Sequence, residues 1–284
     1  MLKPWIEAMR LRTLPVSVAG VITAAGYAIH AGCFLWTPAL LCLLFAILCQ
    51  IASNFANEYY DFKAGRDRVG REGPRRGVTE GDITPQGMKR AIFGTLAAAA
   101  ITGLSLTYWG GLWLIIAGIA IFAGALAYST GPWPLSTHCL GEVAVIIFFG
   151  IVPVNFTYYI MAAEWDTDVF LGSIAIGLMG ANVLIVNNYR DVDDDRAVGK
   201  HTLATVAPRL MPPLYFLNAA VAMVCVLPVW KSLGNGWIAA PAAYLVIAAV
   251  IATAMSRTSG RALTKFLGMT AVSMMLYAIV FIIA

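Results

Sequence analysis

The chain has 284 residues, of which 60% are hydrophobic and only 12% are charged, and its mean hydropathy is +0.77. Soluble domains contain roughly 25% charged residues, so the composition excludes a soluble globular protein and indicates an integral membrane protein. The net charge of +4 is explained by basic loops on one side of a membrane, and we expect no nucleic-acid partner. The length suffices for eight or nine spanning helices of about 20 residues each.

The predicted elements begin with an amphipathic helix over residues 1–13, in which apolar and charged side chains alternate with helical period and which we expect to lie in the membrane interface. No cleavable signal peptide is expected. Nine apolar segments follow and predict nine transmembrane helices, over residues 14–33, 36–57, 91–109, 112–128, 142–161, 169–189, 211–230, 237–255 and 266–284. The predicted fold is therefore all-α, with residues 1–284 forming a single transmembrane domain.

The distribution of basic residues predicts the orientation of these helices. Eighteen of the nineteen Lys and Arg residues lie in the N-terminal segment and in the loops after the second, sixth and eighth predicted helices. Cytoplasmic loops are enriched in Lys and Arg, so we expect these segments on the cytoplasmic side and Ala284 near the outer face. The expected location is a bacterial inner (plasma) membrane.

Two acidic motifs lie at the cytoplasmic ends of predicted helices. Asn57 and Asp61 are followed by Asp67, and 130 residues later Asn187 and Asp191 are followed by three aspartates at 193–195. Four residues turn a helix by about 400°, so the Asn and the first Asp of each motif project from the same face. Ionisable groups at membrane depth normally mark a functional site. Carboxylate and amide oxygens without nearby thiolates or paired histidines favour Mg²⁺ over Zn²⁺.

The loops beside both motifs mix basic and acidic residues. Residues 61–90 carry eight basic side chains among five carboxylates, and residues 190–209 repeat the mixture. Membrane topology alone would also place basic loops inside. The repetition favours a functional explanation, in which Mg²⁺ bridges a polyanion to the carboxylates while Arg and Lys neutralise the remaining charge. The sequence has no Walker-type or G-x-G-x-x-G motif, so a nucleotide site is not expected.

Four segments resemble, in order, the signatures of the UbiA superfamily of intramembrane aromatic prenyltransferases. They read NEYYDFKAGRD, GPRRGVTEGDITP, YSTGPWPLS with GEVAVIIFFGIVP, and NNYRDVDDDRAVGKHTLA. Within the superfamily they are most similar to the 1,4-dihydroxy-2-naphthoate polyprenyltransferases of menaquinone biosynthesis. The resemblance runs from Arg12 to about Leu203 and so covers most of the chain.

The resemblance implies nine transmembrane helices, Mg²⁺, polyprenyl diphosphate as donor and 1,4-dihydroxy-2-naphthoate as acceptor, within membrane lipid. The implied reaction is prenyl transfer with decarboxylation, which yields demethylmenaquinone. The implied metal ligands are Asn57, Asp61, Asp67, Asn187, Asp191 and Asp195. The implied catalytic residues are Asp61, Asp67, Asp191 and Asp195. The candidate substrate-binding residues are Lys63, Arg75, Arg76, Tyr128, Asn188, Arg190, Arg196 and Lys200.

Three positions qualify the resemblance. The family usually has N-D-x-x-D in its first motif, but Glu58 replaces the second residue here. Glutamate keeps the charge and adds a methylene, which leaves open whether it contacts metal, and Glu58→Asp is expected to retain most activity. Tyr128 is followed by Ser-Thr-Gly-Pro without the lysine of other branches, which argues against a benzoate acceptor. Glu142 opens the fifth predicted helix, where it either contacts the acceptor or caps the helix.

A carbocation formed from the donor must be protected from water, which an apolar cavity with aromatic walls would do. The candidate wall residues are Tyr60, Tyr128, Phe148, Phe149, Tyr158 and Tyr189. Two alternatives stay open. One is a related enzyme that uses another aromatic acceptor. The other is an ion-coupled transporter, although transporters place such charges near mid-helix, whereas these motifs lie at helix ends.

Overall fold

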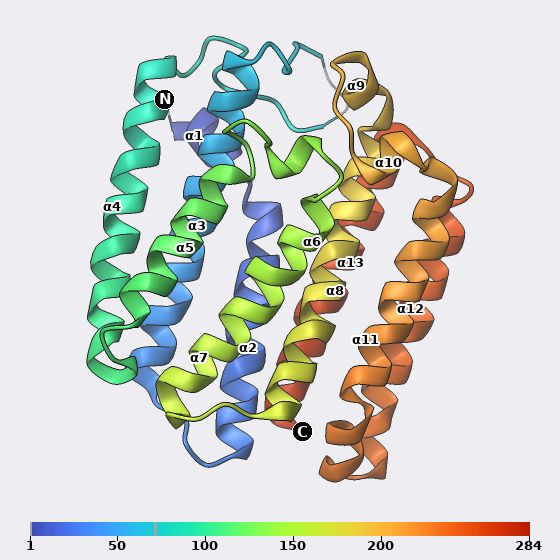
Figure 1. The fold of residues 1–284 in the computed structure, drawn as a ribbon. Coiled ribbons are helices and arrows are strands. Elements are labelled where there is room, and N and C mark those ends of the chain that lie inside the picture. The colour runs from blue at the N-terminus through green and yellow to red at the C-terminus, as the bar shows by residue number, and fades with distance from the viewer. Residues whose placement is uncertain (1, 71–72) are drawn as a thin grey trace.

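The computed structural model describes residues 2–70 and 73–284, and this part of the chain is a bundle of long helices with roughly aligned axes (Figure 1). The helices are α1 (Leu2–Met9), α2 (Leu14–His30), α3 (Trp36–Lys63), α4 (Pro85–Gly110), α5 (Leu114–Ala127), α6 (Gly141–Val145), α7 (Val152–Ala162), α8 (Thr167–Arg190), α9 (Val192–Ala197), α10 (Leu203–Val206), α11 (Met211–Leu233), α12 (Ala239–Met255) and α13 (Thr264–Ile283). The described residues contain no β-strand, and the all-α prediction is confirmed.

The predicted count of nine spanning helices is not confirmed. Eight helices among the described residues are long and apolar enough to cross a membrane. The remaining apolar helix, α5, has 14 residues, which at 1.5 Å per residue is about 21 Å long. That is shorter than the hydrocarbon core of about 30 Å. The two ends of the chain nevertheless lie at opposite ends of the bundle (Figure 1).

Two helices are longer than predicted at the ends nearest the acidic motifs. Helix α3 continues to Lys63 instead of ending at residue 57, and α4 begins at Pro85 instead of residue 91. The start of α4 follows from Thr84, whose side chain accepts a hydrogen bond from the N–H of Gly87, and from Pro85 at the first helical position. As a result, Asn57 and Asp61 both lie on the last two turns of a helix.

Helix α8 is packed tightly against the first half of the chain. A π-helical turn, Ile146–Ile151, joins α6 to α7, and Pro153, which lacks an N–H, follows it. A Cβ added to Gly150 in this turn would lie 2.4 Å from the Cα of Gly177 in α8. Close backbone approach through small residues is how helices associate in lipid, where no hydrophobic force drives them together. This contact helps to hold the second motif, at the end of α8, against the half that carries the first.

Loops and short helices cover one end of the bundle, where α1, α9, α10 and the ends of α3 and α8 come together (Figure 1). The segment before α6 is tied to the segment before α10, because the N–H of Cys139 donates to the carbonyl of His201 at 2.9 Å. Two parts of the chain that are about 60 residues apart therefore form one cover over this end.

Candidate active site

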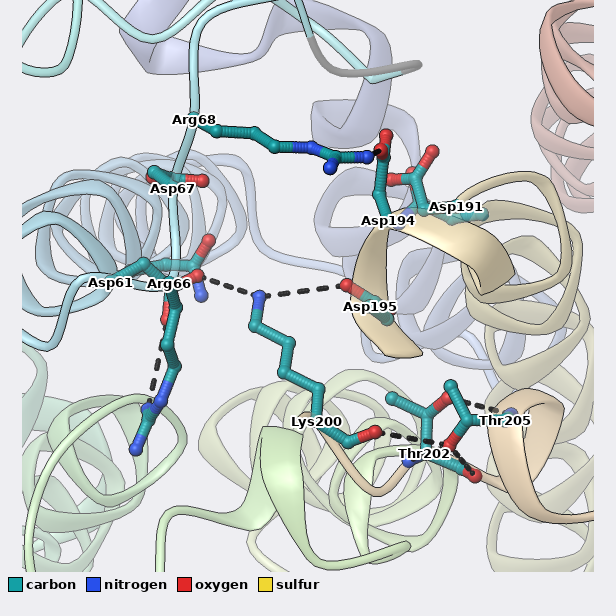
Figure 2. Close-up of polar contacts among 12 residues, drawn as sticks. Asp61, Arg66, Asp67, Arg68, Asp191, Asp194, Asp195, Lys200, Thr202 and Thr205 are labelled. Atoms are coloured by element: carbon teal, nitrogen blue, oxygen red, sulfur yellow. Dashed lines mark hydrogen bonds and ion pairs between the residues drawn. The ribbon is translucent and has the colours of Figure 1, made fainter. Parts of the chain in front are cut away.

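The two acidic motifs meet at this covered end, with Lys200 between them (Figure 2). Its Nζ donates to Oδ2 of Asp61 at 2.9 Å and lies 3.8 Å from Oδ1 of Asp195. A second contact joins the same segments, since Arg68 from the loop after α3 donates to Asp194 of α9. Motifs that are 130 residues apart in the sequence thus form a single site.

The first motif is held by a buried arginine. Nη2 of Arg76 donates to Oδ1 of Asn57 at 3.2 Å, and its Nε lies 3.5 Å from Oδ2 of Asp67. Asn57 also receives a hydrogen bond from Arg10 and donates to Oγ of Ser129 at 3.2 Å. The loop after α3, the N-terminal segment and the segment after α5 therefore converge on one asparagine.

The second motif is held in a similar way by Arg190. Its Nε and Nη2 donate to the two carboxylate oxygens of Asp191 at 2.6 and 2.9 Å, and Nη2 also donates to Oδ1 of Asn187 at 2.9 Å. The Arg190 side chain is only 4% exposed. A buried ion pair requires such additional hydrogen bonds to offset desolvation, so the pair fixes the orientation of both motif side chains.

The carboxylate and amide oxygens of the two motifs are of the type that binds Mg²⁺, although they do not surround a common point as the ligands of a metal ion would. No group of three or more His, Cys, Asp or Glu side chains among residues 2–70 and 73–284 forms a metal-binding arrangement. Lysine and arginine occupy the space between the carboxylates instead. The oxygens are of the kind that Mg²⁺ prefers, and Oδ1 of Asp61 is buried with no hydrogen-bond partner in the described part of the chain.

A polar cavity of about 550 Å³ opens beside the motifs. Its walls come from the N-terminal segment, α3, the loop after α3, the segment after α5, α8 and the segment after α9. Most of the predicted site residues line it, and these are Asn57, Arg75, Arg76, Tyr128, Asn187, Asn188, Arg190, Asp191, Asp195 and Lys200. The cavity therefore collects polar and charged side chains of both signs, as an anion bound through a metal would need.

Four predicted site residues are not brought to the cavity wall. Asp61 and Asp67 are buried behind Lys200 and Arg76, with which they form ion pairs. Lys63 is exposed and is the last residue of α3. Arg196 is half exposed and donates to the backbone carbonyl of Thr205. The sequence places these side chains near the motifs but does not determine the direction in which each one projects.

Arg75 lines the polar cavity near its surface, with 46% of its side chain exposed. A hydrogen bond to Asp82 raises the pKa of its guanidinium, and Glu80 and Glu7 raise it further. The side chain is therefore held as a cation at the rim of the cavity.

A second, apolar cavity of about 270 Å³ continues from the polar one into the bundle. Gln50, Ser53, Tyr128 and Phe149 line both cavities, so the two meet at these residues. Of the predicted aromatic wall residues, Tyr128, Phe148 and Phe149 line the apolar cavity, whereas Tyr60, Tyr158 and Tyr189 line neither. The two cavities together therefore form one space with a polar end and an apolar end.

The sequence interpretation missed several cavity residues. The sequence pattern predicts an interfacial helix that includes Arg10, but α1 ends at Met9 and Arg10 adopts a left-handed conformation with φ of 51°. Its side chain points to Asn57. Gln50 and Asn54 were also missed, although with Asn57 they form a polar stripe at helical spacing in an otherwise apolar segment. Polar residues at helical spacing within an apolar segment indicate a polar face, and this pattern could have identified Gln50 and Asn54.

The two glutamates with open roles have partners other than the implied metal ligands. Oε1 of Glu58 accepts a hydrogen bond from the N–H of Val78 at 3.0 Å, so its carboxylate turns toward the loop after α3. Oε1 of Glu142 accepts from Nδ2 of Asn188 at 3.1 Å. Neither glutamate lines the polar or the apolar cavity. Glu58 therefore holds the loop backbone at Val78, and Glu142 holds the side chain of Asn188, which lines the polar cavity.

Comparisons with known proteins agree with this arrangement. Residues 19–281 match the model of the UbiA prenyltransferase family, and the chain therefore belongs to that family. With its eight apolar helices, it is an integral membrane protein.

Relatives and solved structures add detail. The chain is 34% identical to the 1,4-dihydroxy-2-naphthoate octaprenyltransferase of Haemophilus influenzae, over 83% of this chain and 80% of that protein. It is 38% identical to the Escherichia coli protein of the same name, over 70% of this chain and 67% of that one. A UbiA homologue from Archaeoglobus fulgidus, solved with GPP and Mg²⁺, covers 99% of this chain and 100% of its own, with a TM-score of 0.70 and 17% identity. The two proteins share a fold.

Proposed function

We propose that this protein transfers a polyprenyl group from polyprenyl diphosphate to 1,4-dihydroxy-2-naphthoate with loss of CO₂, giving the quinol form of demethylmenaquinone. The observation that carries this proposal is the pair of joined cavities, one polar and bordered by both acidic motifs, the other apolar and partly aromatic. A prenyl diphosphate has the same two-part character. The names of the relatives from Haemophilus influenzae and Escherichia coli support the choice of acceptor.

In this proposal the diphosphate occupies the polar cavity, held by Asn57, Asn187, Asp191 and Asp195 through Mg²⁺, with Asp61 and Asp67 joining once their basic partners move to the anion. Bound Mg²⁺ would supply positive charge that stabilises the diphosphate as a leaving group. The basic residues at the cavity, Arg76, Arg190 and Lys200, neutralise the rest of its charge. The carbon–oxygen bond then breaks, and its electron pair leaves with the diphosphate.

The allylic cation that forms is shielded at the apolar end. The faces of Tyr128 and Phe149 stabilise positive charge, and the apolar wall excludes water. The electron-rich naphthoate ring attacks the cation and forms the new carbon–carbon bond. The bond to the carboxylate breaks and returns its electron pair to the ring as CO₂ departs. No side-chain nucleophile takes part.

The location is also a proposal. The excess of Lys and Arg in the loops at the site end supports a cytoplasmic site in a bacterial inner membrane. We further propose that residues 1–284 act as one transmembrane domain and that the N-terminal amphipathic segment lies in the interface, with Trp5 packed on Phe55 of α3.

The test is a reaction with purified protein in detergent, Mg²⁺ and a labelled polyprenyl diphosphate. The acceptor panel contains 1,4-dihydroxy-2-naphthoate, 4-hydroxybenzoate and other hydroxyarenes, and the lipid products are identified by mass. We expect a prenylated naphthoquinol lacking the carboxylate. A product from another acceptor alone would identify a related prenyltransferase instead, and no prenylated product with any acceptor would refute the proposal.

A further inference from the structure

The position of the reacting carbon follows from the joined cavities, if the proposed function holds. In a prenyl diphosphate, the carbon that reacts is the one bonded to the diphosphate. With the diphosphate in the polar cavity and the chain in the apolar cavity, this carbon lies where the cavities meet. The residues that line both cavities are Gln50, Ser53, Tyr128 and Phe149. The acceptor ring must reach the same point to attack.

Gln50 is held at this junction in one orientation. Nδ2 of Asn54 donates to the carbonyl oxygen of Met9 at 2.9 Å, and this carbonyl can only accept. The Oδ1 of Asn54 therefore faces Nε2 of Gln50, which donates to it at 3.2 Å and to Oγ1 of Thr13 at 3.4 Å. Hydrogen-bond networks of this kind decide the direction of a side-chain amide. The amide oxygen of Gln50 consequently faces Ser17, which itself lines the apolar cavity.

The amide oxygen of Gln50 has capacity for one more hydrogen bond. An amide oxygen accepts two, and Oγ of Ser17 supplies one at 3.3 Å. Gln50 is 8% exposed and lies deep in α3, so a polar ligand atom that reaches it is removed from water. The free position selects a donor such as a hydroxyl and disfavours an ether or a carboxylate.

We propose that the hydroxyarene acceptor binds at the junction of the two cavities, where Gln50 Oε1 accepts a hydrogen bond from one of its ring hydroxyls. The ring lies beside Tyr128 and Phe149 at the junction, and its carboxylate points into the polar cavity toward the basic residues. Gln50 thereby distinguishes a hydroxyl from groups that cannot donate, and it orients the ring against the reacting carbon.

The competing explanation is structural, because the same contacts tie α2 to α3. A purely structural glutamine would affect the binding of donor and acceptor alike, together with the stability of the fold. If Gln50 contacts the acceptor, substituting it changes the affinity for the acceptor alone. The size of that change then depends on whether the acceptor carries a free hydroxyl at the contacted position.

The experiment measures dissociation constants by calorimetry, with Mg²⁺ and an unreactive polyprenyl thiodiphosphate present. The ligands are 1,4-dihydroxy-2-naphthoate and its two mono-methyl ethers, and the proteins are wild type, Gln50→Leu and Gln50→Asn. The matched control is Thr23→Val, which removes a buried hydroxyl from α2 away from both cavities. Donor affinity is measured separately for each protein.

We expect wild type and Thr23→Val to bind the diol at least tenfold more tightly than one of the ethers, or roughly 1.4 kcal/mol. Gln50→Leu should bind the diol about tenfold more weakly and lose this preference, while its donor affinity changes less than twofold. Gln50→Asn, which withdraws the amide oxygen by one methylene, should lose most of the preference for the diol over the ether. This variant tests the inference if Gln50→Leu does not fold. A preference independent of residue 50, or equal losses for donor and acceptor, would overturn the inference. Failure of the proposed function is distinct, because wild type would then form no product from the naphthoate.

Discussion

Glu58→Asp is expected to destabilise the protein, because the carboxylate at position 58 is a structural hydrogen-bond acceptor. Glu58 is 1% exposed, and its Oε1 accepts from the N–H of Val78 at 3.0 Å. Aspartate is shorter by one methylene, about 1.5 Å, so the donor and acceptor would no longer be within hydrogen-bond distance. This contact replaces the expectation from the family motif that aspartate would be well tolerated.

The size of the effect follows from burial. Val78 is 3% exposed, so its N–H would be left unsatisfied at a cost of about 1–3 kcal/mol. For a protein of this size we expect a loss of roughly 2–4 °C in the unfolding midpoint for each kcal/mol. Glu58→Gln can keep an oxygen in the same place, so the hydrogen bond from Val78 is retained and this variant should be less destabilised than Glu58→Asp. The loop that Glu58 holds carries Arg75 and Arg76, so Glu58→Asp should also weaken donor binding.

The assay compares the thermal midpoints of wild type, Glu58→Asp and Glu58→Gln in the same detergent at one heating rate, together with donor KM. Which of the two variants is more damaged distinguishes a structural role of Glu58 from a role as a metal ligand. A carboxylate that binds metal needs its charge, so a metal ligand would make Glu58→Gln the more damaging change in Mg²⁺ titrations. If Glu58→Gln loses Mg²⁺ affinity while Glu58→Asp remains stable and active, the role assigned to Glu58 is wrong.

Three other predictions concern the site and its orientation. Asp61→Ala and Asp191→Ala should each lower the rate by about two or more orders of magnitude, measured with labelled donor; near wild-type rates in either variant would contradict a site built from both motifs. EDTA should abolish turnover, and added Mg²⁺ should restore it, because the site oxygens are those of a hard-cation site; full turnover in metal-free buffer would argue against a metal. Cysteines placed at positions 70 and 199, in Gly70→Cys and Gly199→Cys, should react only with reagents that reach the cytoplasm, and one in Thr167→Cys should react from outside. If an impermeant reagent labelled the Gly199→Cys variant on intact cells, the predicted orientation would be wrong.

The fold class could be predicted because it depends on local properties. Long apolar segments can satisfy their backbone groups in lipid only as helices or closed barrels, and the spacing of Asn57 and Asp61 places both on one helical face. The pairing of the two motifs was also predictable, since each lies at a helix end on the side with basic loops. Helix ends were less accurate, because α3 continues through its motif to Lys63.

Packing determines which predicted residues form the cavity wall, and no periodic pattern records it. Lys200 and Asp61 are 139 residues apart, yet their ion pair draws Asp61 away from the polar cavity. Arg10 reaches Asn57 only because the chain turns sharply after α1. Glu58 has the charge expected of a metal ligand, but its extra methylene lets it reach the backbone of Val78. Composition and spacing thus establish which side chains lie at the membrane surface, while contacts between distant segments select which of them face the substrate.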